Sequence, residues 1–334
     1  MTFGLFLEWF IKSLVVILAL TIGFAYVTWF ERRVLARFQV RIGPNRAGKQ
    51  GLLQPVADAL KLIFKEELVP EKADKLIFIM APVLTMIPAL IITAVVPWGP
   101  SITLFGKTFT LSVADINLGA LYILTVTSIS IYGITLAGWS SNNKYATLGG
   151  LRATAQMISY ELALGLAFVG PILLAGSMSI TDIVNAQKDM WYIVYQPLGA
   201  LIYFIAAVAE INRSPFDMPE AEQELTAGYH TEYSGMKFAL FFMAEYIKMI
   251  AISMIGASLF LGGFQGPFLD KAPWLGPIWL FVKVVALLFI LVWIRATLPR
   301  IRYDRLMAFG WKLLFPLALL NVMITALVIT LVGG

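Results

Sequence analysis

The sequence predicts an all-α integral membrane protein with a single membrane domain over residues 1–334. The domain is expected to be a bundle of about eight transmembrane helices with one additional, interfacial amphipathic helix. Hydrophobic residues make up 59% of the chain and charged residues only 13%, and the mean hydropathy is +0.81. Apolar runs of about 18 to 25 residues, long enough to cross a bilayer, recur along the chain. Lysine and arginine gather between alternate runs. These features leave no room for a large soluble domain.

Eight apolar runs are candidate spans, near Phe10–Phe30, Leu76–Trp98, Val113–Ala137, Ala153–Ala175, Tyr192–Ile211, Phe238–Leu261, Ile278–Ile294 and Trp311–Val332. An even count places both termini on one side of the membrane. If that side is the outer one, 19 of the 25 Lys and Arg fall on inner loops or helix edges, as the positive-inside rule expects. The net charge of +5 therefore reflects topology and requires no nucleic acid as a partner. Residues 1–20 lack a basic start and a small-residue cleavage site, so we interpret them as a retained first span.

The first inner loop, ERRVLARFQVRIGPNR, is the most basic part of the chain. Anchoring at the inner surface explains Arg37 and Arg46. Glu31, Arg32 and Arg33, however, fall in the predicted last turn of the first span, where the helix dipole favours cations over an acid, so Glu31 needs a partner. Apolar residues at helical spacing then predict a helix over Pro55–Leu68 that is too short to span. It is expected to lie in the membrane interface, or else to pack as a surface helix beneath a partner protein.

The loop between the fifth and sixth predicted spans, RSPFDMPEAEQELTAGYHTE, concentrates negative charge. It holds a quarter of the 20 acidic residues: Asp217, Glu220, Glu222, Glu224 and Glu232. Asp217 and Glu220 have the spacing of a capping box, which predicts a short helix over Met218–Ala227. The loop has no metal-ligand partners and no local surplus of Lys or Arg, so its crowded carboxylates indicate proton handling. A solvated acidic loop at the membrane surface is the alternative.

Carboxylates also occur inside the predicted spans. Glu161 lies about nine residues into its span, ~13 Å deep, and Glu245 with Lys248 lies at a similar depth. Glu210 continues the series near the end of the fifth span. Ionisable groups near the bilayer midplane usually face a bundle interior or a water-filled path, so a functional role is the default interpretation. Glu245 and Lys248, three residues apart, could instead form a structural pair, whereas Glu161 has no such local partner. Three tyrosines could extend a proton relay or simply pack: Tyr160, Tyr229 and Tyr246.

The residue inventory excludes several kinds of redox and metal chemistry. The chain has no cysteine, which rules out disulfides, thiolate zinc sites and iron–sulfur ligation within it. Its single histidine, His230, rules out a bis-histidine haem. No metal site is predicted, and no cofactor is expected to be bound by this chain alone. Any redox centre is therefore expected on another subunit.

Two segments resemble the signatures of a known family. GLLQPVADALK (Gly51–Lys61) and PFDMPEAEQELTAG (Pro215–Gly228) are similar to those of the H-subunit family of proton-pumping NADH-quinone oxidoreductase, respiratory complex I. The stretch ERRVLARFQVRIGPNR and the eight expected spans resemble the same family. The similarity covers essentially the whole chain, and neither segment departs from the pattern.

The resemblance implies a membrane subunit at the junction with the peripheral arm of the complex, in a bacterial-type plasma (inner) membrane. It implies a part in forming the chamber that quinone, the substrate, enters from the lipid. Electrons would arrive from iron–sulfur clusters, which with FMN would sit on partner subunits. Candidate chamber residues are Glu31, Arg32, Arg33, Ala59, Phe216 and Asp217. The acids that would couple quinone reduction to proton translocation are Glu161, Glu210, Glu220, Glu222, Glu224, Glu232 and Glu245.

Two other functions remain open from the sequence. A stand-alone secondary proton or cation transporter would also place acids at the midplane, but it usually has repeated halves, and none are visible here. A passive membrane anchor of a soluble complex would explain the basic loop and the amphipathic helix but would not need Glu161. The proteins that copurify with the chain would separate these alternatives.

Overall fold

The computed structural model describes residues 3–104, 107–217, 227–269 and 271–332. Within these ranges, seven helical stretches are long and apolar enough to cross a membrane. They are α1 (Phe3–Phe38), α3 (Lys75–Ile91, continued by the 3-10 turn Ile92–Val95), α4 (Gly119–Ser140), α5 (Lys144–Ala175), α10 (Gly235–Phe260), α11 (Gly276–Thr297, preceded by the 3-10 turn Pro273–Leu275), and α12 (Tyr303–Phe309), which runs through a π-helical turn (Gly310–Leu314) into α13 (Phe315–Val332). The prediction of an all-α membrane protein is confirmed.

Shorter elements connect the long helices. They are α2 (Gln54–Ile63), α6 (Ile180–Ala186), α7 (Tyr192–Tyr195), α8 (Pro197–Glu210), the 3-10 turns Lys49–Gly51 and Gly228–His230, and the strands β1 (Gly99–Leu104) and β2 (Lys107–Leu111). The two strands pair antiparallel in a small hairpin between α3 and α4, which was not predicted from the sequence.

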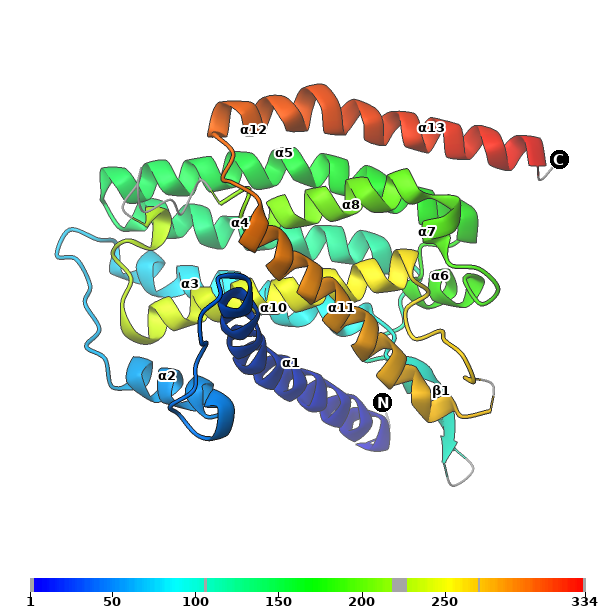
Figure 1. Ribbon diagram of the computed structural model, residues 1–334, viewed down its shortest axis with the longest axis horizontal. Coiled ribbons are helices and arrows are strands. Elements are labelled where there is room, and N and C mark those ends of the chain that lie inside the picture. The colour runs from blue at the N-terminus through cyan, green and yellow to red at the C-terminus, as the bar shows by residue number, and fades with distance from the viewer. Residues whose placement is uncertain (1–2, 105–106, 218–226, 270, 333–334) are drawn as a thin grey trace.

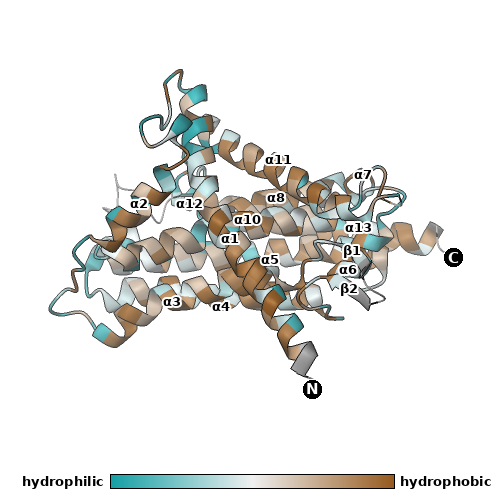
Figure 2. Cartoon of the chain, turned by 90° about the horizontal axis from the view of Figure 1, so that it is seen from below, coloured by the Kyte–Doolittle hydropathy of each residue, from teal (hydrophilic) through white to brown (hydrophobic). Residues whose placement is uncertain are grey.

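The long helices form a bundle in which α3, α4, α5, α8 and α10 run side by side (Figure 1). On one face α1 and α11 both pack against α10, while α13 lies along α5 and α8 at the opposite edge. Both chain ends point toward the end of the bundle that carries β1, α6 and α7 (Figure 1). Hydrophobic residues cover the lengths of the helices and hydrophilic ones gather at their ends (Figure 2).

The fifth predicted span is broken. The sequence predicted one helix over Tyr192–Ile211, but the chain forms α7, bends at Gln196 and continues as the 14-residue α8. The bend has a local cause, because Pro197 disfavours helical geometry in the residue before it, and Gln196 has φ −132° and ψ 59°. The side chain of Gln196 holds the bend by donating to Thr325 Oγ1 at 2.8 Å. At about 1.5 Å per residue α8 is roughly 21 Å long, less than the ~30 Å hydrocarbon core.

Two other helix boundaries also differ from prediction. Helix α1 continues to Phe38, so Glu31 lies about two turns before its end and not in the last turn. Helix α5 begins at Lys144 and not near Ala153, because Asn143 caps it by accepting from the backbone N–H of Tyr145 at 2.9 Å. Glu161 therefore lies near the middle of a 32-residue helix. Polar residues in the first turns of α5 hid this extension from a hydropathy reading.

The interfacial helix and the third predicted span are shorter than expected. The amphipathic helix α2 ends at Ile63 and not at Leu68. The third predicted span begins at Gly119 and not at Val113, because the chain between β2 and α4 is irregular. The short helix predicted over Met218–Ala227 lies almost wholly outside the described residues.

Lys283, an ammonium inside a predicted span, has a structural explanation. From α11, Lys283 Nζ donates to the carbonyl oxygens of Leu261, Gly263 and Gln265 at 2.6, 2.9 and 2.6 Å, and it lies over the ring of Trp191. These carbonyls follow the end of α10, where backbone acceptors lose their helical partners. The ammonium therefore fixes the C-terminal end of α10.

Helices α3 and α4 pack closely because Gly133 has no side chain. A Cβ built on Gly133 would lie 2.8 Å from the backbone nitrogen of Thr85 and 2.9 Å from the carbonyl oxygen of Ala81. Since backbone atoms cannot rotate away, Gly133→Ala is expected to destabilise the protein by about 1–3 kcal/mol. The apparent melting temperature of the purified protein should fall accordingly.

A matched control lies on α5. The Cβ of Gly165→Ala would meet only Leu124 Cδ1, at an ordinary 3.8 Å, and removing a helical glycine favours the helix by up to about 1 kcal/mol. Equal melting temperatures for the two alanine variants would contradict close α3–α4 packing as the reason for Gly133.

Candidate functional site: a cavity with buried ion pairs

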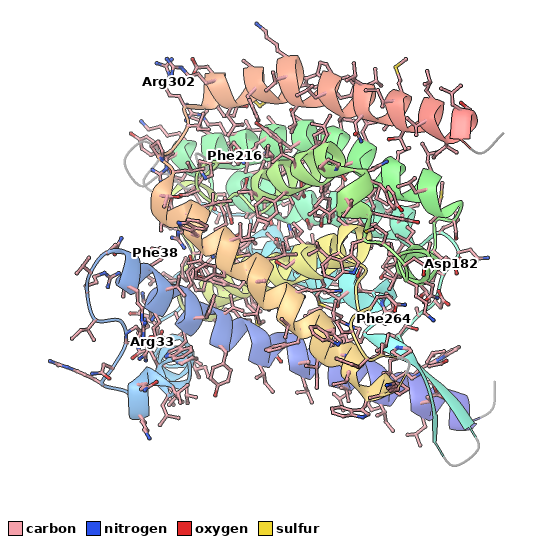
Figure 3. All side chains as sticks on the ribbon, turned by 45° about the vertical axis from the view of Figure 1, so that its right-hand side comes forward. Arg33, Phe38, Asp182, Phe216, Phe264 and Arg302 are labelled. Atoms are coloured by element: carbon pink, nitrogen blue, oxygen red, sulfur yellow. The ribbon has the colours of Figure 1, made fainter. Side chains whose placement is uncertain are left out.

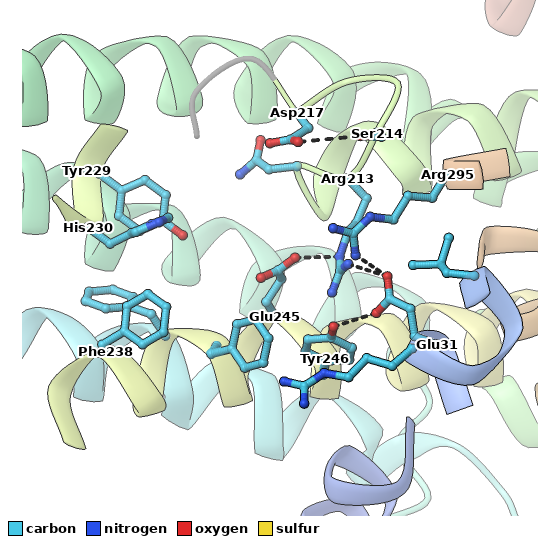
Figure 4. A pocket seen from close by; sticks show the side chains of 15 residues that line it. Glu31, Arg213, Ser214, Asp217, Tyr229, His230, Phe238, Glu245, Tyr246 and Arg295 are labelled. Carbon is cyan, nitrogen blue, oxygen red and sulfur yellow. Dashed lines mark hydrogen bonds and ion pairs between the residues drawn. The ribbon is translucent and has the colours of Figure 1, made fainter. Parts of the chain in front are cut away.

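A cavity of about 290 Å³ lies beside the point where α8 ends. Its walls come from α1, α10, the last turn of α11 and the segments that flank the acidic loop. The lining residues are Glu31, Arg32, Leu35, Asn212, Arg213, Ser214, Asp217, Tyr229, His230, Phe238, Phe241, Phe242, Glu245, Tyr246 and Arg295. Charged groups occupy one side and aromatic rings of α10 the other (Figure 4).

Glu31 is the centre of the charged side. Only 2% of its side chain is exposed, and its carboxylate accepts from Arg213 at 2.9 Å, from Arg295, and from the hydroxyl of Tyr246 at 2.5 Å. The expectation that Glu31 needs a partner is therefore met, although Glu31 does not lie in the last turn of α1. The contacts join three helices and the loop after α8, so they fix the elements around the cavity (Figure 4).

Arg213 bridges two acids. It pairs with Glu31, and its Nε lies 2.5 Å from Glu245 Oε1, while its guanidinium sits 4.4 Å from the ring centre of Tyr246. Burial alone would lower the pKa of Arg213, but the carboxylates of Glu245 and Glu31 raise that pKa well above its usual value. Arg213 therefore stays charged, and with Arg295 it balances the two acids.

The segment that carries Arg213 is irregular but buried. After α8 ends at Glu210, residues 211–216 leave the helix inside the protein. Gln156 of α5 supports them, because its Nε2 lies within hydrogen-bond distance of the carbonyls of Ala209 and Phe216, at 2.9 and 2.8 Å, and of Asn212 Oδ1 at 3.0 Å. Irregular backbone can be buried where side chains satisfy its polar groups, and part of this segment also lines the cavity.

Three further ionisable groups lie deeper in the bundle. Glu161 of α5 accepts from the hydroxyl of Ser128 on α4. Lys248 of α10 donates from Nζ to Ser130 Oγ at 2.6 Å. Glu210 is 1% exposed, and neither of its carboxylate oxygens has a hydrogen-bond partner among the described residues. Their charges act on one another, since the Lys248 ammonium attracts Glu210 and Glu161 while Glu161 repels Glu210.

Glu245 has an ion-pair partner that the sequence did not suggest. Glu245 forms its ion pair with Arg213, which faces it from the loop after α8, and Lys248 points instead to Ser130. Asp217 likewise accepts from Arg300 at 2.9 Å, although the acidic loop has no local surplus of Lys or Arg. Neither partner could be identified from spacing, because both arginines are distant in sequence.

The chain after the acidic loop is tied to the bundle. Glu232 accepts from Asn143 Nδ2 at 2.6 Å, next to the start of α5. Tyr233 stacks on Phe78 and donates to its carbonyl oxygen at 3.1 Å, and burial raises the pKa of Tyr233 to about 12, which keeps the phenol protonated. Glu220, Glu222 and Glu224 lie outside the described residues.

The other residues singled out in the sequence lie in different places. Arg32 lines the cavity and pairs with Asp58 of α2 at 2.6 Å. Arg33 donates to the Gln50 carbonyl at 2.6 Å, Ala59 is exposed on α2, and neither lines the cavity. Phe216 packs inside the bundle, with its ring 5.7 Å from that of Tyr160 (Figure 3). Tyr160 donates to the Leu306 carbonyl at 2.9 Å and Tyr229 lines the cavity.

Arg213 and Arg295 are the site residues that sequence reasoning missed. Arg213 opens the acidic loop and Arg295 follows a predicted span, so each was explained by the positive-inside pattern. The available signal was that Glu31, an acid near the end of a predicted helix, needs a positively charged partner. This signal did not identify which arginine would pair with Glu31. Among the described residues, no group of three His, Asp or Glu comes together as metal ligands would.

These features define a class: a multi-pass membrane protein that buries several ion pairs beside a polar cavity. The chain matches the model of the family described as NADH dehydrogenase over residues 11–326. It is 54% identical over 314 residues to the NADH-quinone oxidoreductase H subunit of Thermomicrobium roseum, with 91% of each chain covered. It is 52% identical over 320 residues to the NADH-quinone oxidoreductase H subunit 2 of Syntrophobacter fumaroxidans, covering 96% of this chain and 95% of the relative. It is also 51% identical over 322 residues to NADH-quinone oxidoreductase subunit 8 of Thermus thermophilus, covering 96% and 87%.

The chain therefore belongs to the H-subunit family of NADH-quinone oxidoreductase, as its two signature segments indicated. It is a membrane subunit of complex I, a multi-pass protein of the inner membrane whose partners are other subunits of the complex.

Proposed function

We propose that this protein takes part in forming the chamber that quinone enters from the bilayer, and that its buried acids couple quinone reduction to proton translocation. The observation that carries the proposal is the cavity at the end of α8, with arginines and a tyrosine on one side and α10 aromatic rings on the other. A quinone headgroup offers two carbonyl acceptors on an apolar ring. Arginine and tyrosine can donate to such acceptors, and the rings can pack on the headgroup or its tail.

The coupling part of the proposal rests on how the charges continue inward from the cavity. Glu245 lines the cavity, and Lys248 follows it three residues later on α10. Lys248 in turn acts on Glu210 and Glu161. A change of charge in the cavity would therefore shift the proton affinities of groups deeper in the bundle. The acids of the loop would extend this series toward the inner surface.

The remaining features of the proposal concern the assembly. Electrons would reach the quinone from iron–sulfur clusters which, like FMN, are held by partner subunits, and this chain would bind no cofactor alone. Both termini would lie on the outer, positive side, as the distribution of Lys and Arg indicates. Lipid would surround the exposed faces of α1 and α11.

Glu161→Gln and Glu245→Gln test the proposal, since each removes a protonatable group with little change in volume. In the assembled complex, each is expected to lower quinone reduction and proton translocation by ~10²-fold or more, the low end of the effect of losing a positioned proton-transfer group. Electron flow from NADH to a water-soluble acceptor should remain unchanged.

Glu66→Gln is the control, because Glu66 is exposed after α2 and should tolerate the same change. Wild-type quinone reduction and proton translocation in both the Glu161 and Glu245 variants would reduce these acids to structural polar groups.

A further inference from the structure

Glu161, Glu210 and Lys248 form what we name the buried triad, and its charge does not balance when all three groups are ionised. The three side chains come from α5, α8 and α10, and α4 supplies the hydroxyls of Ser128 and Ser130. Glu210 is 1% exposed and Lys248 7% exposed, whereas Glu161 is half-buried. Two carboxylates and one ammonium leave one uncompensated negative charge in an apolar interior, which is costly.

The neighbouring charges do not supply the missing compensation. Among the described residues, Glu245 also acts on Lys248, but it already pairs with Arg213 at 2.5 Å. Arg213 and Arg295 together balance Glu31 and Glu245. The buried triad must therefore reach neutrality by itself.

Lys248 is held in place as a donor. The hydroxyl of Ser130 donates to the Thr127 carbonyl at 2.7 Å, so toward Lys248 Ser130 can act only as an acceptor, at 2.6 Å. This contact holds the ammonium against α4.

The hydroxyl of Ser128 suits Glu161 in either protonation state. Ser128 Oγ lies within hydrogen-bond distance of Glu161 and also 2.9 Å from the Leu124 carbonyl, but it has a single proton to donate. If Glu161 is ionised, Ser128 donates to it. If Glu161 carries a proton, Glu161 donates to Ser128, which turns to Leu124.

The ionised form of Glu210 depends on the Lys248 ammonium for its stabilisation. Its carboxylate oxygens have no hydrogen-bond partner among the described residues, and it ends α8, where the helix dipole disfavours negative charge. Lys248 attracts the Glu210 carboxylate and Glu161 repels it. Without the ammonium, an ionised Glu210 would be stabilised by nothing in the described structure.

We propose that Lys248 is a charge-setting residue: its ammonium compensates one carboxylate, so that Glu161 and Glu210 together hold one proton and can exchange it. Transfer of that proton from one carboxylic acid to the other carboxylate leaves the charge of the triad unchanged. The importance of this exchange for turnover rests on the proposed coupling function. The shared proton itself follows from charge balance alone.

Lys248→Gln is the sharpest test, because glutamine is neutral but can still donate to Ser130. In the assembled complex, infrared spectra should gain one protonated carboxylic acid, in the C=O stretching region that shifts in heavy water. The gained band should disappear when Glu210→Gln or Glu161→Gln is added. Proton translocation per quinone reduced should fall, whereas Lys248→Arg, which keeps the charge, should retain both the wild-type band count and translocation.

Lys283→Gln is the matched control, since it removes another buried ammonium that contacts backbone carbonyls and not acids. It should add no protonated carboxylic acid. If Lys248→Gln adds none either, or if Lys248→Arg and Lys248→Gln are impaired equally, the proposal for Lys248 is overturned.

The same experiments separate this inference from the proposed function. Wild-type translocation in Glu161→Gln and Glu210→Gln would remove the coupling role, and the carboxylic-acid count in Lys248→Gln would still decide whether Lys248 sets the charge. Impaired translocation in both acid variants, with no added acid band in Lys248→Gln, would overturn only the role of Lys248.

Discussion

Arg213→Met is expected to cause the largest loss of stability and assembly of any single change at the cavity. It removes one of the two arginines that neutralise Glu31 and the cation that pairs with Glu245. Removing one partner of a buried ion pair typically costs about 3–5 kcal/mol, because the remaining charge stays buried without compensation. The amount of assembled complex and its apparent melting temperature should both fall.

Two other arginine changes make the Arg213 result specific. Arg213→Lys keeps the charge but cannot present two nitrogens to two acids, so it should be intermediate. Arg302→Met breaks an exposed pair with Asp304, in which the Arg302 side chain is 74% exposed, and should assemble normally (Figure 3). A melting temperature for Arg213→Met equal to that of Arg302→Met would contradict a stabilising role for the buried ion pairs.

Leu35→Trp is expected to give the largest effect on quinone use without affecting assembly. Leu35 of α1 lines the cavity and is only half-buried, so a larger side chain can project into the 290 Å³ space. The apparent KM for quinone should rise roughly tenfold, equivalent to about 1.4 kcal/mol of lost binding. Electron flow from NADH to a water-soluble acceptor should be unaffected.

Ile22→Trp is the control on the same helix, because Ile22 is 57% exposed and does not line the cavity. It should leave the KM for quinone unchanged. Equal KM values for the two tryptophan variants would place the quinone somewhere other than this cavity.

The sequence predicted the membrane class and most of the spans because apolar length is a local property. The prediction failed where the local structure depends on a residue that is distant in sequence. The break before α8 depends on Pro197, but the bend is also held by Thr325, more than a hundred residues away. The polar start of α5 reads as loop by hydropathy, and only its cap at Asn143 indicates a helix.

The candidate site shows the same contrast between what local sequence reveals and what depends on distant residues. The deep acids Glu161 and Glu245 could be identified because an ionisable group in an apolar run is conspicuous. Their partners could not be identified. Glu31 and Arg213 are 182 residues apart, and Glu31 and Arg295 are 264 apart, so no spacing rule connects them. Ser128 and Ser130 are ordinary residues of an apolar helix until α5 and α10 bring a carboxylate and an ammonium to them.

Helix α10 carries aromatic wall residues of the cavity, Glu245, Tyr246 and Lys248 on one uninterrupted stretch, Gly235–Phe260. Each residue in an α-helix is turned by about 100° from the one before it. Deleting or inserting a single residue between the aromatic rings and Lys248 would therefore swing the ammonium away from Ser130 while the rings stayed in place. The number of residues between the aromatic wall of the cavity and the ammonium is thus as constrained as the identity of those residues. Members of this family that vary the side chains here should still keep the helix free of insertions and deletions.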